Sequence, residues 1–174
     1  MDLKDSLTIY SSKENFDTLK ENFSNIIPKN QIIILPAYSY KHLFYNGTLE
    51  IFKYLNENFD EDTINILGDD EIYREISLHS KAHWIGVFLV SSVLTPIFTD
   101  VVSNYINEEL NAEPKDEVAL TINVVKKDKT TTSIDYRGDA EHLDKFFEEV
   151  NKLSEENESN KPITIKPINK HWWL

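Results

Sequence analysis

Glu75, His79 and His83 recur every fourth residue and are the side chains best placed to share a metal ion. On a helix, this spacing would align them along one face. Imidazole and carboxylate groups so placed can bind a divalent ion, although zinc would need a fourth ligand or a water molecule. The His-Glu-x-x-His arrangement of zinc proteases is absent. The stripe is therefore a candidate metal site, and the interpretation that we favour is a solvated helix face.

A second group of carboxylates, Asp69, Asp70 and Glu71, follows a short predicted strand. In open α/β sheets, ligands bind at the carboxyl ends of the strands, so these groups could hold magnesium. The same residues would also cap a helix N-terminus and complement its dipole. We favour capping, because it requires no bound ion.

The usual signatures of nucleotide binding and of covalent catalysis are absent. Ser11, Ser12 and Lys13 stand where a phosphate-binding loop would place glycines. The chain has no Gly-x-Ser-x-Gly elbow, and it has no cysteine that could act as a nucleophile or ligate zinc. The sequence therefore predicts no catalytic residue, no nucleotide and no cofactor, and it favours a protein that is not an enzyme.

Residues 84–99 form the longest uncharged run of the chain. A helix that spans a membrane needs roughly 20 apolar residues, and a buried or interfacial helix typically has roughly 10 to 14, so the length of this run lies between the two. Extension to residue 106 would bring Asp100 into the bilayer, and no cluster of basic residues flanks the run. Burial in the core or in a subunit interface is favoured over membrane insertion. As an interface, the run would make contact through Trp84, Val87, Phe88, Val90, Leu94 and Phe98.

The C-terminal segment places Trp172, Trp173 and Leu174 after a polar linker. Tryptophan is enriched at the energetic centres of protein interfaces, so this segment could dock into a partner. A tryptophan pair also buries a large apolar area, so the segment could equally fold back onto the core of its own chain. Both alternatives remain open at this point.

Composition limits the class of protein and of partner. The chain has 174 residues, a formal net charge of -12 and a hydrophobic fraction of 40%, which suit a folded domain with a core. The acidic balance argues against direct binding of nucleic acid, because such proteins need a basic face. The lack of cysteine and of a visible secretory signal predicts a cytoplasmic location. Association with the inner membrane is the alternative.

The elements that must position these residues begin with a small parallel sheet in βαβαβ order. We expect strands at residues 6–11, 31–35 and 63–67. An amphipathic helix should follow the capping box of Ser11 and Glu14, and a second should cover residues 49–59.

A long helix is expected over residues 70–109, where it would carry both the metal-binding stripe and the apolar run. Pro96 should kink or break it. Strands at residues 118–125 and 131–136 should then form a hairpin, followed by a helix that Asp139 caps.

The predicted fold class is α/β, with α+β character in the C-terminal part. The expected regions are residues 1–113 with the sheet and the long apolar helix, residues 114–153 as a ββα unit, and residues 154–174 as a linker and tail with a short strand. The three regions could also form one compact domain.

Three stretches of the C-terminal half resemble small uncharacterised bacterial proteins found with mobile elements and phage-defence genes. They are Ser-Ser-Val-Leu-Thr-Pro-Ile at 91–97, Asn-Tyr-Ile at 104–106 and Ile-Asp-Tyr-Arg-Gly-Asp-Ala at 134–140. These stretches contain no catalytic motif, so the resemblance implies a biological setting and no chemistry.

Three hypotheses of function follow. The leading one is a non-enzymatic adaptor, accessory or regulatory subunit of a bacterial defence assembly, which binds a protein partner or a second copy of itself. The alternatives are an effector that inserts residues 84–106 into a membrane and a metal-dependent enzyme that uses Glu75, His79 and His83 or the Asp69 cluster.

Overall fold

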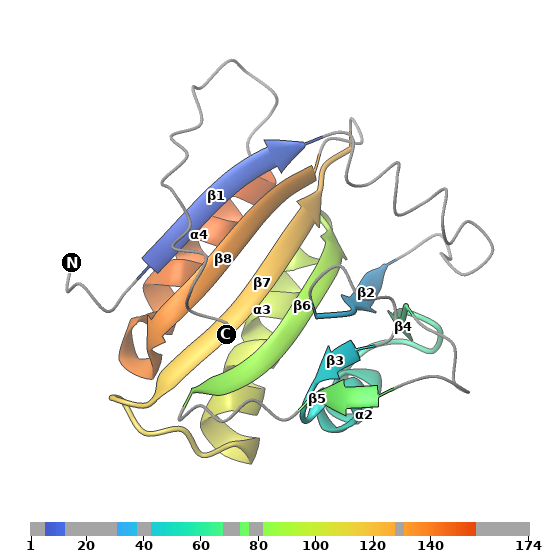
Figure 1. Cartoon of the computed structure of the whole chain (residues 1–174). Helices are drawn as coiled ribbons and strands as arrows, with labels where there is room; N and C mark the ends of the chain where they lie inside the picture. The colour runs from blue at the N-terminus through green and yellow to red at the C-terminus, as the bar shows by residue number, and fades with distance from the viewer. Residues whose placement is uncertain are drawn as a thin grey trace.

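A six-stranded sheet with helices packed on one face is the centre of the structure (Figure 1). The computed structural model describes residues 6–12, 31–37, 43–67, 74–76, 82–127 and 131–155. The order of the strands across the sheet is β1-β8-β7-β6-β2-β4. Their bounds are β1 (Ser6–Ser12), β2 (Ile32–Leu35), β4 (Ile64–Ile66), β6 (His83–Ser91), β7 (Glu117–Val125) and β8 (Thr131–Asp139).

The pairing directions are mixed, and the chain has the predicted α/β fold. Strands β2 and β4 are parallel, as are β6 and β7, and the other neighbouring pairs are antiparallel. In each parallel pair a helix lies between the two strands in the chain, as a parallel connection requires. These helices are α2 (Thr48–Asn58) and α3 (Thr95–Asn104). Strands β3 (Leu43–Tyr45) and β5 (Arg74–Ile76) form a second small parallel sheet, which the sequence did not predict.

The long helix expected over residues 70–109 is wrong in its first part, and only residues 95–109 are helical as predicted. Residues 74–76 form β5 and residues 83–91 form β6, which lies inside the sheet between β7 and β2. The apolar run is continuous because β6 is buried on both of its faces, and such a strand lacks the alternation that marks a half-exposed one. Periodicity alone does not distinguish a fully buried strand from a buried helix.

Pro96 begins a helix and does not kink one. It occupies the first turn of α3, where the missing backbone N–H would have had no partner within the helix. The helix then continues as a short π-helix, Tyr105–Glu109.

Strand β1 exists as predicted, but its place in the sheet differs from the expected βαβαβ arrangement. It lies at the far edge and pairs antiparallel with β8. Only β2 and β4 form the predicted parallel pair with a helix between them. The predicted first helix and Glu14 of its capping box lie outside the described residues, whereas Ser11, the other residue of that box, lies in β1.

The C-terminal hairpin and helix are confirmed, but the predicted cap is wrong, because Asp139 precedes a 3-10 turn and its side chain makes no cap hydrogen bond there. Strands β7 and β8 form the antiparallel hairpin, and the helix α4 (Leu143–Glu155) follows a short 3-10 turn, Ala140–His142. The predicted apolar positions of α4 point into the core, where Leu143, Phe146, Phe147 and Val150 are buried. Because β6 pairs with β7, the sheet contains strands from both sides of the predicted boundary near Pro114.

The main core lies between the sheet and the helices. Buried side chains of α2, α3 and α4 pack against alternate residues of the strands, among them Ile34, Phe88, Val90, Ile122 and Ile134. We call the opposite side of the sheet the outer face. No helix of the described part of the chain contributes a side chain to it, and α3 and α4 both lie behind the sheet in Figure 1.

Candidate functional site

Alternation along β7 and β8 places a set of polar side chains on the outer face. Since Leu120, Ile122 and Ile134 point into the main core, the residues between them point the other way. The polar residues so placed are Thr121, Asn123, Thr131, Ser133 and Asp135.

Two hydrogen-bonded pairs cross from β8 to β7 on this face. The Thr121 hydroxyl donates to Oδ1 of Asp135 over 2.6 Å. Two residues along, the Ser133 hydroxyl donates to Oδ1 of Asn123. The Asn123 amide in turn donates to the carbonyl oxygen of Phe88 over 3.0 Å. The pair of Asn123 and Ser133 is therefore also fixed to the central strand β6.

Asp135 is the buried carboxyl group of the outer face. It is 9% exposed, and its hydrogen bond to Thr121 is not accompanied by a cationic partner within the described residues. Burial raises the pKa of this carboxyl above its ordinary value, and the Thr121 hydrogen bond opposes that shift only in part. A buried carboxyl with a raised pKa and no cation marks a candidate functional site.

Further polar atoms on this face are buried without a hydrogen-bond partner. They are Oγ1 of Thr131, Nε2 of Gln31 and Nδ2 of Asn65. Thr131 is 3% exposed and Gln31 is 8% exposed. Gln31 precedes β2 and Asn65 lies in β4, and the alternation of both strands puts them on the side opposite the main core. Buried polar groups are hydrogen-bonded in the great majority of cases, so these atoms require an explanation.

The other half of the outer face is apolar. Ile33, Leu35, Leu67 and Leu89 form a buried cluster, and Val87 and Val125 pack against it half-exposed. The outer face thus combines an apolar patch over β2 and β6 with hydrogen-bonding groups over β7 and β8.

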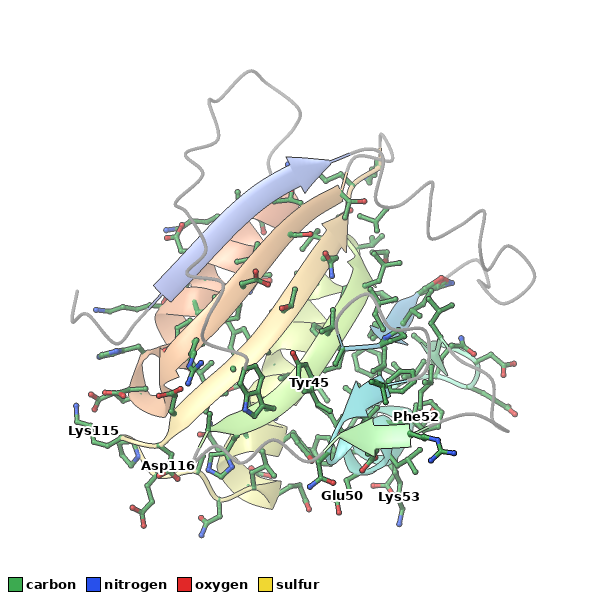
Figure 2. All side chains as sticks on the ribbon, in the orientation of Figure 1. Tyr45, Glu50, Phe52, Lys53, Lys115 and Asp116 are labelled. Atoms are coloured by element: carbon green, nitrogen blue, oxygen red, sulfur yellow. The ribbon has the colours of Figure 1, made fainter. Side chains whose placement is uncertain are left out.

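Trp84 contacts two side chains near the start of β6. Tyr45 stacks on its ring, with centroids 5.0 Å apart and planes inclined by 25°, and the Arg137 guanidinium carbon lies 5.5 Å from its centroid. Arg137 also donates from Nε to a carboxylate oxygen of Glu117. Figure 2 shows Tyr45 at this part of the sheet.

Charged residues gather where β6 and β7 begin and β8 ends. Nε2 of His83 lies 3.3 Å from Oδ2 of Asp116, and that carboxylate also accepts from the Glu113 backbone amide over 2.8 Å. The backbone hydrogen bond, with a smaller contribution from His83, lowers the pKa of Asp116. Lys115 and Asp116 lie at the lower end of the sheet in Figure 2.

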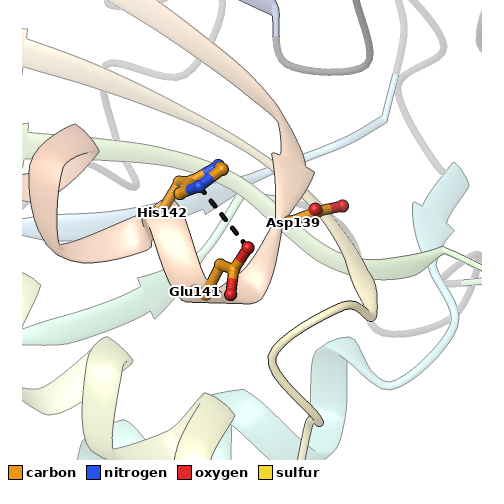
Figure 3. Close-up of side chains that lie close together, drawn as sticks. All are labelled: Asp139, Glu141 and His142. Carbon is orange, nitrogen blue, oxygen red and sulfur yellow. Dashed lines mark ion pairs between the residues drawn. The ribbon is translucent and has the colours of Figure 1, made fainter. Parts of the chain in front are cut away.

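Asp139, Glu141 and His142 form a group whose ligand atoms lie within 4.8 Å of one another (Figure 3). The ammonium group of Lys115 already contacts both carboxylates, at 3.5 Å from Asp139 and closer to Glu141. Nε2 of His142 lies 3.6 Å from the Glu141 carboxylate. A lysine therefore supplies the positive charge that a metal would bring, and we assign no metal to the group.

The residues of the predicted metal stripe do not share a helix. Glu75 lies in β5, where its carboxylate accepts from the backbone amides of Gly47 at 3.2 Å and Leu49 at 3.3 Å and so caps α2. His83 lies in β6 and pairs with Asp116. His79, Asp69 and Asp70 lie outside the described residues. The predicted alignment of these residues along one helix face is wrong, because Glu75 and His83 lie in two different strands.

The structure places the predicted interface residues at different depths. Phe88, Val90 and Phe98 are fully buried in the main core, and Leu94 packs against it half-buried. Val87 belongs to the outer face, and Trp84 is held by Tyr45 and Arg137. Trp172, Trp173 and Leu174 lie outside the described residues.

Sequence reasoning missed the polar residues of the outer face. Their signal was present: in the predicted hairpin, Thr121 and Asn123 alternate with apolar residues, and Ser133 and Asp135 flank Ile134. Alternation of this kind normally indicates a solvated face, so it gave no reason to expect that the polar side would be buried.

Among the described residues, no helix combines the length and the apolar character that crossing a membrane requires. Comparison of the chain with protein-family models, with curated proteins and with solved structures gave no match.

Proposed function

We propose that this chain is a non-enzymatic interaction subunit that holds an extended polypeptide segment of a partner protein on its outer face. One observation supports the proposal above all others. Buried hydrogen-bonding atoms of Thr131, Gln31 and Asn65 lack partners on a face that no described helix covers. A segment that displaces what buries these atoms and packs against the strands would satisfy them.

The chemistry of the outer face fits a polypeptide better than a small polar ligand. An extended chain offers alternating N–H and C=O groups, which match the hydroxyl, amide and carboxyl groups of Thr131, Asn123 and Asp135. Its apolar side chains would cover the patch around Leu89 and Ile33. Nucleic acid fits poorly, because the chain has a net charge of -12.

The polar groups of this face also favour binding over catalysis. The Thr121 hydroxyl donates to a carboxyl and the Ser133 hydroxyl to an amide, so neither is paired with the imidazole base that a serine-type nucleophile requires. The hydrogen bonds of these groups instead fix their positions, as a recognition surface needs.

The proposal is tested by affinity capture from the bacterium that encodes the chain, with variants that change the outer face alone. Asp135→Asn removes the carboxyl charge, and Thr121→Val removes its hydroxyl partner without changing the size of the side chain. Asp144→Asn makes the same chemical change as the first variant at an exposed position of α4 and is the matched control.

A protein that the wild type and the Asp144→Asn variant both capture, and that the two outer-face variants lose, would support the proposal once the purified pair reproduces the loss. Equal capture by all four proteins would contradict it. If residues of this chain itself occupy the face, the outer-face variants would capture the same proteins as the wild type whatever their stability, which also contradicts it.

A bacterial, antiviral setting and a cytoplasmic location are part of the proposal. The setting is supported by the resemblance of residues 91–97, 104–106 and 134–140 to proteins encoded near phage-defence genes. An adaptor of such an assembly needs a binding surface and no chemistry of its own.

A further inference from the structure

Strand β1 forms one edge of the sheet and has a neighbour on one side only. It pairs with β8 through all seven of its residues, from Ser6 opposite Arg137 to Ser12 opposite Thr131, without a register shift. No strand of the described ranges pairs with its other side. The backbone N–H and C=O groups along that side are therefore arranged to accept another strand.

Three of the features that can protect an edge strand, namely charge, proline and a bulge, are missing from β1. Its sequence, Ser-Leu-Thr-Ile-Tyr-Ser-Ser, contains no charged residue and no proline, and its ladder has no bulge. The opposite edge differs, because β4 has only three residues. A short edge offers few hydrogen bonds to another chain, so β4 has a protection that β1 lacks.

We infer that β1 is a homodimer interface, at which the strand pairs antiparallel with β1 of a second copy of this chain. A two-fold axis through Ile9 gives the register that pairs all seven residues, with Ser6 of one copy opposite Ser12 of the other. Two-fold symmetry makes such a contact closed and self-complementary, and the two sheets would become one. Strand β1 borders the outer face, where Thr8 is opposite Asp135 and Ser12 is opposite Thr131, but the inference rests on the backbone edge of β1 and does not depend on the proposed function.

The net charge of the chain should make the stability of the inferred dimer depend on salt concentration. Each chain carries a net charge of -12, which opposes association, while the contacting strand itself is neutral. Screening at higher ionic strength weakens the long-range repulsion and leaves the backbone hydrogen bonds in place. The dimer should therefore become tighter as salt is added.

Sedimentation velocity on the full chain, at rising protein concentration and at low and high salt, tests the inference together with two double variants. Ser6→Lys with Ser12→Lys places like charges opposite each other at both ends of the strand pair. Ser6→Lys with Ser12→Glu places opposite charges there and keeps the net charge of the wild type. We expect the first variant to raise the dimer dissociation constant roughly tenfold and the second to restore it.

The lysine pair also lowers the magnitude of the net charge, so general electrostatic association would be strengthened by it and not weakened. A wild type that stays monomeric at every concentration and salt level would overturn the inference. Equal dimerisation of the two charge variants would overturn it as well.

A crosslinking experiment covers the case in which the lysine variant fails to fold. The chain has no cysteine, so Ser6→Cys with Ser12→Cys introduces the only thiols. Within one copy these residues are about 20 Å apart along the strand, too far for a disulfide, whereas directly opposed residues of paired strands lie about 4.5 to 5.5 Å apart. Mild oxidation should give a covalent dimer of the double variant.

Ser6→Cys alone is the matched control, because the inferred register places it opposite serine. Absence of the covalent dimer, or its equal formation by the control, would contradict the register.

Discussion

At the scale of single residues, Asp135 should affect both the free energy of unfolding and the proposed binding of a partner on the outer face. Its carboxyl is buried beside one hydroxyl donor, and burial raises its pKa. The folded state therefore binds a proton more tightly than the unfolded state does. The free energy of unfolding should fall as the pH rises from the unfolded pKa, about 4, through the raised folded pKa, and it should stay lowered above that point.

Asp135→Asn should consequently be more stable than the wild type at pH 7. The amide oxygen still accepts from Thr121, and the cost of burying a charge is removed. The difference between the two proteins should vanish below the unfolded pKa, where the carboxyl is protonated in both states. Urea unfolding at a series of pH values measures this. Equal stability at pH 7 and in acid would mean that Asp135 carries no desolvation penalty.

Glu75 was predicted as a candidate metal ligand, and in the structure its carboxylate caps the helix α2. The helix α2 begins after Gly47, which has no side chain to cap the helix and which adopts a φ of 91°. The carboxylate of Glu75, far away in sequence, accepts from the first backbone amides instead. Such an acceptor satisfies amides that would otherwise lack a partner within the helix.

Glu75→Ala should lower the free energy of unfolding by about 0.5 to 2 kcal/mol, the usual cost of losing a helix cap. Glu57→Ala, at the other end of α2, is the control. Removal of an acidic side chain near a helix C-terminus should be neutral or slightly stabilising. Chemical denaturation of both variants measures the effect, and equal stability of the two would show that Glu75 doesn't cap α2.

At the scale of elements, β6 depends on Gly86. This residue has a φ of 152°, and the register between β6 and β7 shifts between Trp84 and Gly86. A Cβ atom at this position would lie 3.0 Å from Cζ of Phe88, a fully buried ring. The irregularity therefore changes the course of the strand just before the buried residues that follow, and only glycine adopts it without strain.

Gly86→Ala should destabilise the protein by about 1 to 3 kcal/mol, because alanine would occupy a strained backbone conformation and crowd Phe88. Val93→Ala is a suitable control in the turn that follows β6, since Val93 is 71% exposed and should change stability by no more than about 0.5 kcal/mol. Thermal unfolding followed by circular dichroism measures both. A Gly86→Ala protein as stable as the control would contradict this role.

Strands and helices whose apolar residues recur with a regular period were predictable from the sequence. The alternation of β7 and β8 and the helical spacing of Phe146, Phe147 and Val150 gave the hairpin and α4 correctly. The segment 84–99 misled because residues buried on both sides of a central strand show neither period. Its branched and aromatic residues favoured a strand, while its length favoured a helix.

At the scale of the whole molecule, the neighbours of each strand were beyond local reasoning. Strand β1 pairs with β8, which is more than a hundred residues away in the sequence. The first and the last described strands are thus neighbours in the sheet. Nothing in the composition of β1 specifies that neighbour. The candidate site could not be predicted for the same reason. Gln31, Asn65 and Asp135 lie beside or within three strands, β2, β4 and β8, and only the final topology brings these strands into one sheet.

The central claim is that the outer face binds a polypeptide segment of a partner, and it is tested most directly by titration calorimetry of the purified partner against three forms of the full chain. Asp135→Asn should raise the dissociation constant about tenfold or more, equivalent to about 1.4 kcal/mol, while remaining folded and at least as stable as the wild type. Asp144→Asn should bind as the wild type does. An unchanged dissociation constant for Asp135→Asn would contradict the account.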